Sequence, residues 1–89
     1  MILHLGFPAC HSLKEKRSQL KPIIARCQRE FNLSIAEVGL MDRWQESLVA
    51  CAVVSNDTTY SQSVLQKTIN LIENTFSSVE IISQKVEFL

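Results

Sequence analysis

Glycine and proline are scarce in this chain, with two residues of each among 89. The phosphate-binding loops of nucleotide-dependent enzymes need closely spaced glycines, so we expect neither a mononucleotide-binding nor a dinucleotide-binding loop. No proline-rich linker or low-complexity tract divides the sequence, which predicts a single domain over residues 1–89. No hydrophobic run reaches the roughly 18 residues that a membrane span requires, so we expect no membrane partner.

Neither sign of charge is in excess, because nine Lys and Arg residues balance nine Asp and Glu residues. A net charge of zero predicts no general attraction to nucleic acid, so any electrostatic binding must be local. The opening MILHLGF lacks the basic n-region of a signal peptide. Three widely spaced cysteines (Cys10, Cys27 and Cys51) do not suit a disulfide framework. These features are typical of a cytoplasmic protein with reduced thiols.

Residues that usually bind metals or carry catalysis are equally sparse. His4, Cys10 and His11 lack the paired spacing of zinc ligands. Cys27 and Cys51 lie in apolar patterns, where thiols behave as small inert hydrophobic side chains. No pair of carboxylates is placed for acid–base chemistry. Nothing in the sequence argues for an enzyme, and we expect no catalytic residue, no metal and no cofactor.

What the chain does contain is an alternation of strand and helix patterns. Apolar runs predict strands over 1–7, 32–41, 47–55 and 79–89, and helical spacing of apolar residues predicts helices over 13–31 and 58–76. Ser12 with Glu15 has the capping-box spacing, and Asn56 and Asp57 supply the second N-cap. The order βαββαβ predicts an α+β ferredoxin-like two-layer sandwich, with a four-stranded antiparallel sheet and both helices on one face.

The apolar positions also predict which side of each element is buried. The expected inward residues are Leu13, Leu20, Ile24, Cys27 and Phe31 in the first helix and Leu65, Ile69, Ile72 and Phe76 in the second. Pro22 lies nearly opposite the first stripe, so a kinked helix is expected to survive there. The third strand, SLVACAVVS, is apolar at nearly every position, as expected for a strand covered on both faces. We expect a second copy of the chain to cover the free face, which makes a homodimer.

The segment HSLKEKRSQL places Lys14, Lys16 and Arg17 at a helix N-terminus, where the helix dipole disfavours cations by roughly 0.3 kcal/mol or more each. In the expected topology the DRWQE turn lies at the same edge of the sheet. Amides of the helix N-terminus, cations and one flat aromatic ring would together suit an anion or an RNA backbone. The candidate binding residues are Ser12, Lys14, Lys16, Arg17, Lys21, Arg43, Trp44 and Gln45.

Simpler interpretations of the same residues remain open. Charges at the start of a helix are usually solvated surface. Trp44 would also serve to pin the hairpin or to fill a dimer interface. The long stems of Lys16 and Arg17 flank the apolar stripe and would cover the edge of the core.

Four segments in fixed order, HSLKEKR, FNLSIAEV, DRWQ and VVSND, resemble the YlxP-like family of small bacterial proteins. The resemblance implies a ferredoxin-like fold and no established activity. The family's pattern falls on Ser12, Leu13, Lys14, Glu15, Lys16, Arg17, Asp42, Trp44, Gln45, Ser55, Asn56 and Asp57. Some members are encoded beside genes for translation initiation and ribosome maturation, which implies a ribosome-linked role. Two departures are a shorter segment before the Ser-Leu-Lys block and a proline at Pro22.

We therefore expect a small cytoplasmic binding module whose partner is RNA or a ribonucleoprotein, with no DNA partner. The alternative is a dimeric structural or regulatory interaction domain that binds a protein or a small anionic ligand. The two differ in salt response, because binding to phosphates weakens steeply as salt rises.

Overall fold

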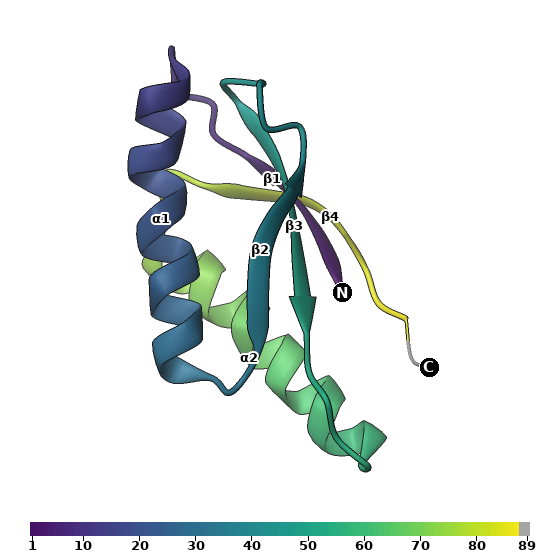
Figure 1. Ribbon diagram of the computed structural model, residues 1–89. Coiled ribbons are helices and arrows are strands. Elements are labelled where there is room, and N and C mark those ends of the chain that lie inside the picture. The colour runs from purple at the N-terminus through teal and green to yellow at the C-terminus, as the bar shows by residue number, and fades with distance from the viewer. Residues whose placement is uncertain (88–89) are drawn as a thin grey trace.

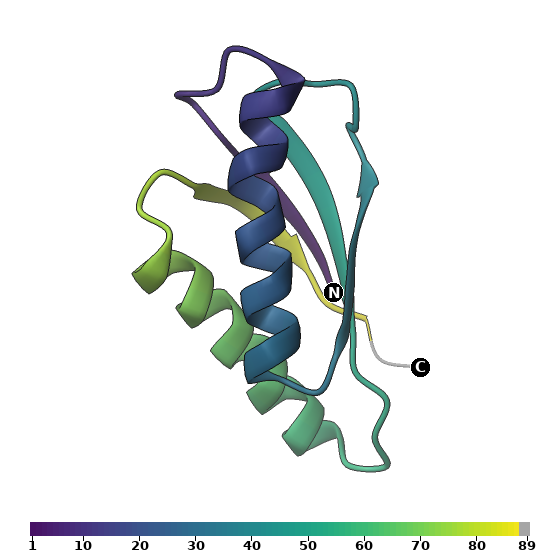
Figure 2. The same ribbon diagram turned by 60° about the vertical axis from the view of Figure 1, so that its left-hand side comes forward.

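The computed structural model describes residues 1–87 and contains six elements in the order βαββαβ. They are β1 (Ile2–Gly6), α1 (Leu13–Glu30), β2 (Ser34–Gly39), β3 (Glu46–Ala52), α2 (Thr58–Thr75) and β4 (Glu80–Lys85). The strands form one sheet in the order β2-β3-β1-β4, and every neighbouring pair is antiparallel. Both helices lie on the same side of this sheet (Figures 1 and 2). The predicted ferredoxin-like sandwich is confirmed.

The ends of the elements differ from the predicted ones by a few residues. The third strand ends at Ala52, so positions 53–55 of its predicted range lie in the connection to α2. The last strand ends at Lys85, and residues 88–89 of its predicted range lie outside the described residues. Within residues 1–87, neither helix has the length and apolar character needed to cross a bilayer.

The start of α1 follows the predicted capping pattern. Ser12 is the N-cap, and its Oγ accepts a hydrogen bond from the Glu15 amide at 3.1 Å. The Glu15 carboxylate accepts in return from the His11 amide at 2.7 Å, one residue before the position of a standard capping box. The helix then runs without a break (Figure 2). Pro22 lies inside it, and its side chain is exposed.

The buried side of α1 differs from the prediction, because Leu13 and Phe31 as well as Ile24 are only half-buried. Its buried residues are Lys16, Leu20, Ile23 and Cys27, a spacing of four, three and four that follows one face of a helix. Ile23 therefore faces the core in place of Ile24, which is half-buried. The second helix agrees more closely with its prediction, because Leu65, Ile69 and Ile72 are buried as expected. Phe76, just past its end, is half-buried.

The core lies between the helices and one face of the sheet. Leu3 and Leu5 of β1 and Val49 of β3 are fully buried there. Burial alternates along β3, so the prediction that both of its faces are covered does not hold within one copy of the chain. The opposite face of the sheet, which we call the open face, carries apolar residues from all four strands: Ile2, Ala36, Val38, Leu48, Ala50 and Ile82.

Both edge strands of the sheet are irregular. The pairing of β2 with β3 shifts between Glu37 and Gly39, which leaves Val38 as the extra residue. The pairing of β4 with β1 shifts in the same way and leaves Ile82 as the extra residue. Each edge strand therefore contains a bulge at an exposed apolar side chain on the open face.

Candidate functional site

Three segments meet at the edge of the sheet where β1 ends, as Figure 1 shows at its top. They are the connection from β1 to α1, the first turns of α1, and the β2–β3 loop over residues 40–45. The Phe7 amide donates to the Gln45 carbonyl at 2.8 Å. The Gln45 side-chain amide donates to the carbonyls of Pro8 (3.3 Å) and Cys10 (3.1 Å). We call this region the loop edge; its predicted assembly from distant segments is confirmed.

Lys16 does not lie on the surface of the loop edge, although it was expected in the binding patch. Its side chain is fully buried, and its Nζ lies 3.0 Å from a carboxylate oxygen of Glu37. The same ammonium donates to the carbonyls of Leu40 (3.0 Å), Met41 (3.2 Å) and Glu46 (3.1 Å). All its donors are used inside the protein, so placing Lys16 in a site for an external anion was wrong.

The loop is shaped around this ammonium. Leu40 has a φ of 57°, a left-handed conformation that costs a non-glycine residue about 1–2 kcal/mol. Its carbonyl is one of the oxygens that contact Lys16 Nζ. The strained turn and the buried cation therefore stabilise each other, and Lys16 holds the loop at both of its ends.

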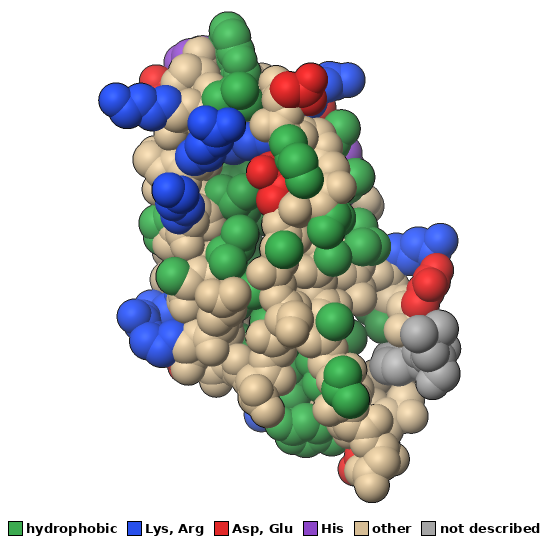
Figure 3. Space-filling view, viewed as in Figure 1, with side chains coloured by type: hydrophobic (Ala, Val, Ile, Leu, Met, Phe, Trp, Pro, Cys, Tyr) green, Lys and Arg blue, Asp and Glu red, His purple; other side chains and the backbone are tan. Residues whose placement is uncertain are grey.

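Of the other basic residues of α1, Arg26 is half-buried and paired with Glu30, whereas the remaining four are exposed: Lys14, Arg17, Lys21 and Arg29. Lys14, Arg17 and Lys21 follow a spacing of three and four, so they share one side of the helix. None of them forms an ion pair with another residue between positions 1 and 87. Figure 3 shows Lys and Arg side chains gathered over α1. We call these three residues the α1 cation row; at 1.5 Å per residue it is about 10 Å long.

Next to the start of α1, the loop forms an open hollow of about 480 Å³. Its lining residues are His11, Asp42, Arg43, Trp44, Gln45 and Glu46, and we call it the Trp44 hollow. Trp44 is 54% exposed, so its ring is accessible to a ligand. The guanidinium of Arg43 makes one long contact of 3.5 Å to Glu46. The hollow thus combines an accessible aromatic ring with charges of both signs.

Apart from the buried Lys16, the predicted site residues fall into three groups. Arg43 and Trp44 lie together in the Trp44 hollow, and Lys14, Arg17 and Lys21 form the α1 cation row. Ser12 and Gln45 use their side chains to cap the helix and to hold the loop. Three lining residues were missed as site residues: His11, Asp42 and Glu46. His11 lies in the segment HSLKEKR, and Asp42 and Glu46 lie in the turn DRWQE, so their positions in these segments were the signal that could have found them.

The cysteines are remote from this edge or face inward. All three thiols are buried and free. Burial raises the pKa of Cys27 and of Cys51 to about 11, and it also raises the pKa of Cys10. The protonated thiol is therefore the favoured form in each case. Among residues 1–87 there is no group of three or more His, Cys, Asp or Glu side chains that could hold a metal ion.

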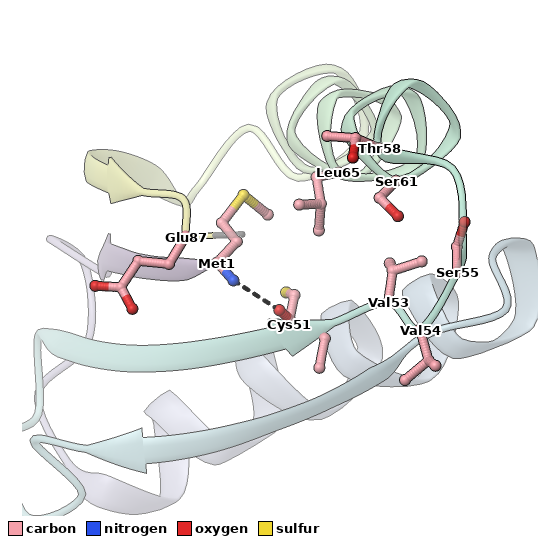
Figure 4. Close-up of a pocket in the computed structure, with 10 residues that line it drawn as sticks. Met1, Cys51, Val53, Val54, Ser55, Thr58, Ser61, Leu65 and Glu87 are labelled. Carbon is pink, nitrogen blue, oxygen red and sulfur yellow. Dashed lines mark hydrogen bonds between the residues drawn. The ribbon is translucent and has the colours of Figure 1, made fainter. Parts of the chain in front are cut away.

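A second cavity, of about 510 Å³, lies between the end of β3 and the start of α2. Figure 4 shows Val53 and Leu65 among its apolar walls, with the hydroxyls of Thr58 and Ser61 on the helix side. The helix amides nearby are already satisfied, because the Asp57 carboxylate accepts from Thr59 and Tyr60. Asp57 is thus the predicted N-cap, and its negative charge makes this end of α2 unsuitable for an anion.

Comparison with known proteins agrees with the resemblance seen in the four sequence segments. Residues 1–86 match the family described as Protein of unknown function (DUF503). Over 83 residues the chain is 37% identical to the "Uncharacterized protein YlxP" of Bacillus subtilis (strain 168), an alignment that covers 85% of this chain and 89% of that protein. Neither description names a reaction or a ligand.

Proposed function

This chain belongs to the DUF503 family, and since the family description names no ligand, we propose a function from the residues of the loop edge. The protein binds RNA, with backbone phosphates on the α1 cation row and one base against Trp44. The observation that carries this proposal is that three cations without an ion-pair partner among the described residues lie on the helix that begins beside the loop of the exposed Trp44. Phosphate contacts and aromatic stacking are the two interactions that binding of single-stranded nucleic acid combines.

The charge distribution supports a local rather than a general attraction. The net charge is zero, and four cations are paired with carboxylates, among them Lys16 with Glu37 and Arg26 with Glu30. Arg29 and Lys67 are exposed and also lack an ion-pair partner among the described residues, but only in the α1 cation row do three such cations share one side of a helix. The α1 cation row has no such partners among the described residues. If all three cations contact phosphates of a single strand, the logarithm of the binding constant should fall with the logarithm of salt with a slope of about −2.

The test is a salt titration of binding to a single-stranded RNA oligomer. The variant Lys14→Gln/Arg17→Gln/Lys21→Gln should bind more weakly and with a slope near zero. Its free energy of unfolding should stay within a few tenths of a kcal/mol, roughly the size of the dipole and repulsion effects that it removes. Lys67→Gln, an exposed lysine on α2, is the matched control and should behave as the parent protein. Unchanged affinity and slope in the triple variant would refute the proposal.

A substitution of Trp44 tests the same proposal independently of the cations. Trp44→Ala should weaken binding by roughly 1–3 kcal/mol if a base stacks on the ring. This loss should be the same at low and high salt, because stacking releases no counterions. A loss that disappears at high salt would instead place Trp44 outside the contact with the base.

A second function, self-association through the open face, is favoured by a separate observation. The open face carries exposed apolar side chains, including Val38 (50% exposed) and Ile82 (51% exposed). The bulges in β2 and β4 disfavour pairing of two sheets edge to edge, which leaves the face as the surface for a second copy. The parent protein should then sediment as a dimer at micromolar concentration, and Val38→Lys should sediment as a monomer. A monomeric parent protein would rule this function out.

A further inference from the structure

The Trp44 hollow has one carboxylate that no other described residue engages. Glu46 contacts the His4 ring at 2.9 Å and Arg43 at 3.5 Å, so both of its carboxylate oxygens have partners. Asp42 forms no hydrogen bond or ion pair with another residue of the described chain. It lines the same hollow as the exposed side chain of Trp44. A free carboxylate repels phosphate and accepts hydrogen bonds, so the hollow suits a base that presents donors.

We infer that the Trp44 hollow selects an unpaired guanine base. Guanine alone among the four RNA bases presents two adjacent donors, N1–H and N2–H, that match the two oxygens of one carboxylate. It also presents the acceptor pair O6 and N7, for which an Arg guanidinium is the commonest partner. Asp42 supplies the acceptors and Arg43, 65% exposed in its side chain, supplies the donors. Trp44 supplies the surface on which the base stacks.

The ligand must be single-stranded at this base. In a duplex the N1–H and N2–H of guanine are paired and both of its faces are stacked, so neither Asp42 nor Trp44 could reach them. Lys16 favours binding in the hollow for another reason, because its ammonium holds the loop through the carbonyls of Leu40, Met41 and Glu46. A loop that is already ordered loses little conformational entropy on binding. The volume of about 480 Å³ is within the range of small-ligand pockets.

The inference rests on the proposed function in one respect, namely that the guanine base belongs to RNA. Free guanosine monophosphate presents the same donors and acceptors, so the experiment must distinguish these two sources. Trp44 is the only tryptophan, so its fluorescence reports the hollow directly. The probes are four single-stranded hexamers that are all uridine except at one central position, which is G, A, C or U, together with guanosine monophosphate. We expect the G hexamer to quench Trp44 and to bind at least about fivefold more tightly than the other three.

Asp42→Asn should remove most of this preference, because the carboxamide retains a single acceptor. Glu73→Gln, an exposed residue on α2, should leave the preference unchanged. Equal quenching by all four hexamers, or a preference that survives in Asp42→Asn, would overturn the guanine inference.

The two remaining outcomes separate the inference from the function on which it rests. Salt-dependent binding without quenching of Trp44 would leave the cation row as an RNA site and overturn the hollow as a base site. Guanosine monophosphate that binds as tightly as the G hexamer would support the guanine site and overturn RNA as its source.

Discussion

Lys16→Met is the substitution that most directly tests how the loop edge is held together. Methionine keeps the length and the apolar stem of the side chain but removes the ammonium. The Glu37 carboxylate then loses its cation, and the carbonyls of Leu40, Met41 and Glu46 lose their donor. Loss of one partner from a buried ion pair costs about 3–5 kcal/mol.

We expect a value near the lower limit, about 3 kcal/mol, for a structural reason. The Glu37 side chain is 20% exposed and keeps the hydrogen bond that the Ser47 hydroxyl donates at 2.7 Å. Water and Ser47 therefore compensate part of the loss. A domain of 89 residues has a free energy of unfolding of about 4–13 kcal/mol. Lys16→Met should thus remove a large share of the free energy of unfolding.

The assay is urea unfolding followed by circular dichroism, with the fluorescence of Trp44 as a local reading of the loop. Lys14→Met is the matched control, because Lys14 is exposed on the same helix, and it should change the free energy by about 0.5 kcal/mol or less. Lys16→Met/Glu37→Leu should recover part of the loss, since no buried charge is then left unpaired. A loss below about 1 kcal/mol in Lys16→Met, or a double variant less stable than the single one, would refute this account.

Three further predictions concern other parts of the molecule. Ser12→Ala should lower the free energy of unfolding by about 1 kcal/mol in urea melts, because the Glu15 amide loses its acceptor, whereas Ser12→Asp should retain it. The pKa of Cys27 and of Cys51 is raised from 9.0 to about 11 in the folded state, so the unfolded chain loses these protons first. The contribution of the two thiols to the free energy of unfolding should therefore be fully present below about pH 9 and should be lost as the pH rises toward 11. Unfolding midpoints in alkaline buffers that stay constant would contradict it, and Cys27→Ala should make the fall shallower. Gly39→Ala should lower the melting temperature in thermal melts, because its added methyl carbon would lie 3.3 Å from Leu48 Cβ, which cannot rotate away as the Leu48 Cδ1 atom at 2.9 Å can; an unchanged melting temperature would contradict this.

Much of the fold could be predicted because the signals are local. Alternation and helical spacing place each element, and Ser12 with Glu15 marks the start of α1. The order of elements then leaves a single common topology, which brings the β2–β3 loop to the start of α1. Ile23 was missed as a core residue because Ile24 fits the apolar spacing nearly as well. The choice between them depends on the contacts of the whole helix with the sheet.

The role of Lys16 could not be predicted from its own segment. Pattern reasoning assigns a charged side chain to the surface, and the oxygens that contact Lys16 come from residues 37–46, more than 20 positions later. The sequence does hold one signal for its burial, because Lys16 lies four residues before Leu20 on the helix face that also carries Cys27. The surface that packs against the open face could not be predicted either, because an apolar strand indicates that its side chains are buried but not which surface buries them. Trp44, by contrast, is found where the topology predicted it.

The strand order sets a time at which the sheet can be completed during synthesis. β1 leaves the ribosome first but pairs with the two strands that follow much later: Leu3 pairs with Val49 on one side and with Gln84 on the other. At about 5–20 residues per second, the second of these partners is made roughly 2–7 s after the first. Through that interval the apolar β1 has one edge unpaired, so the nascent chain gains its full core only when β4 has been made.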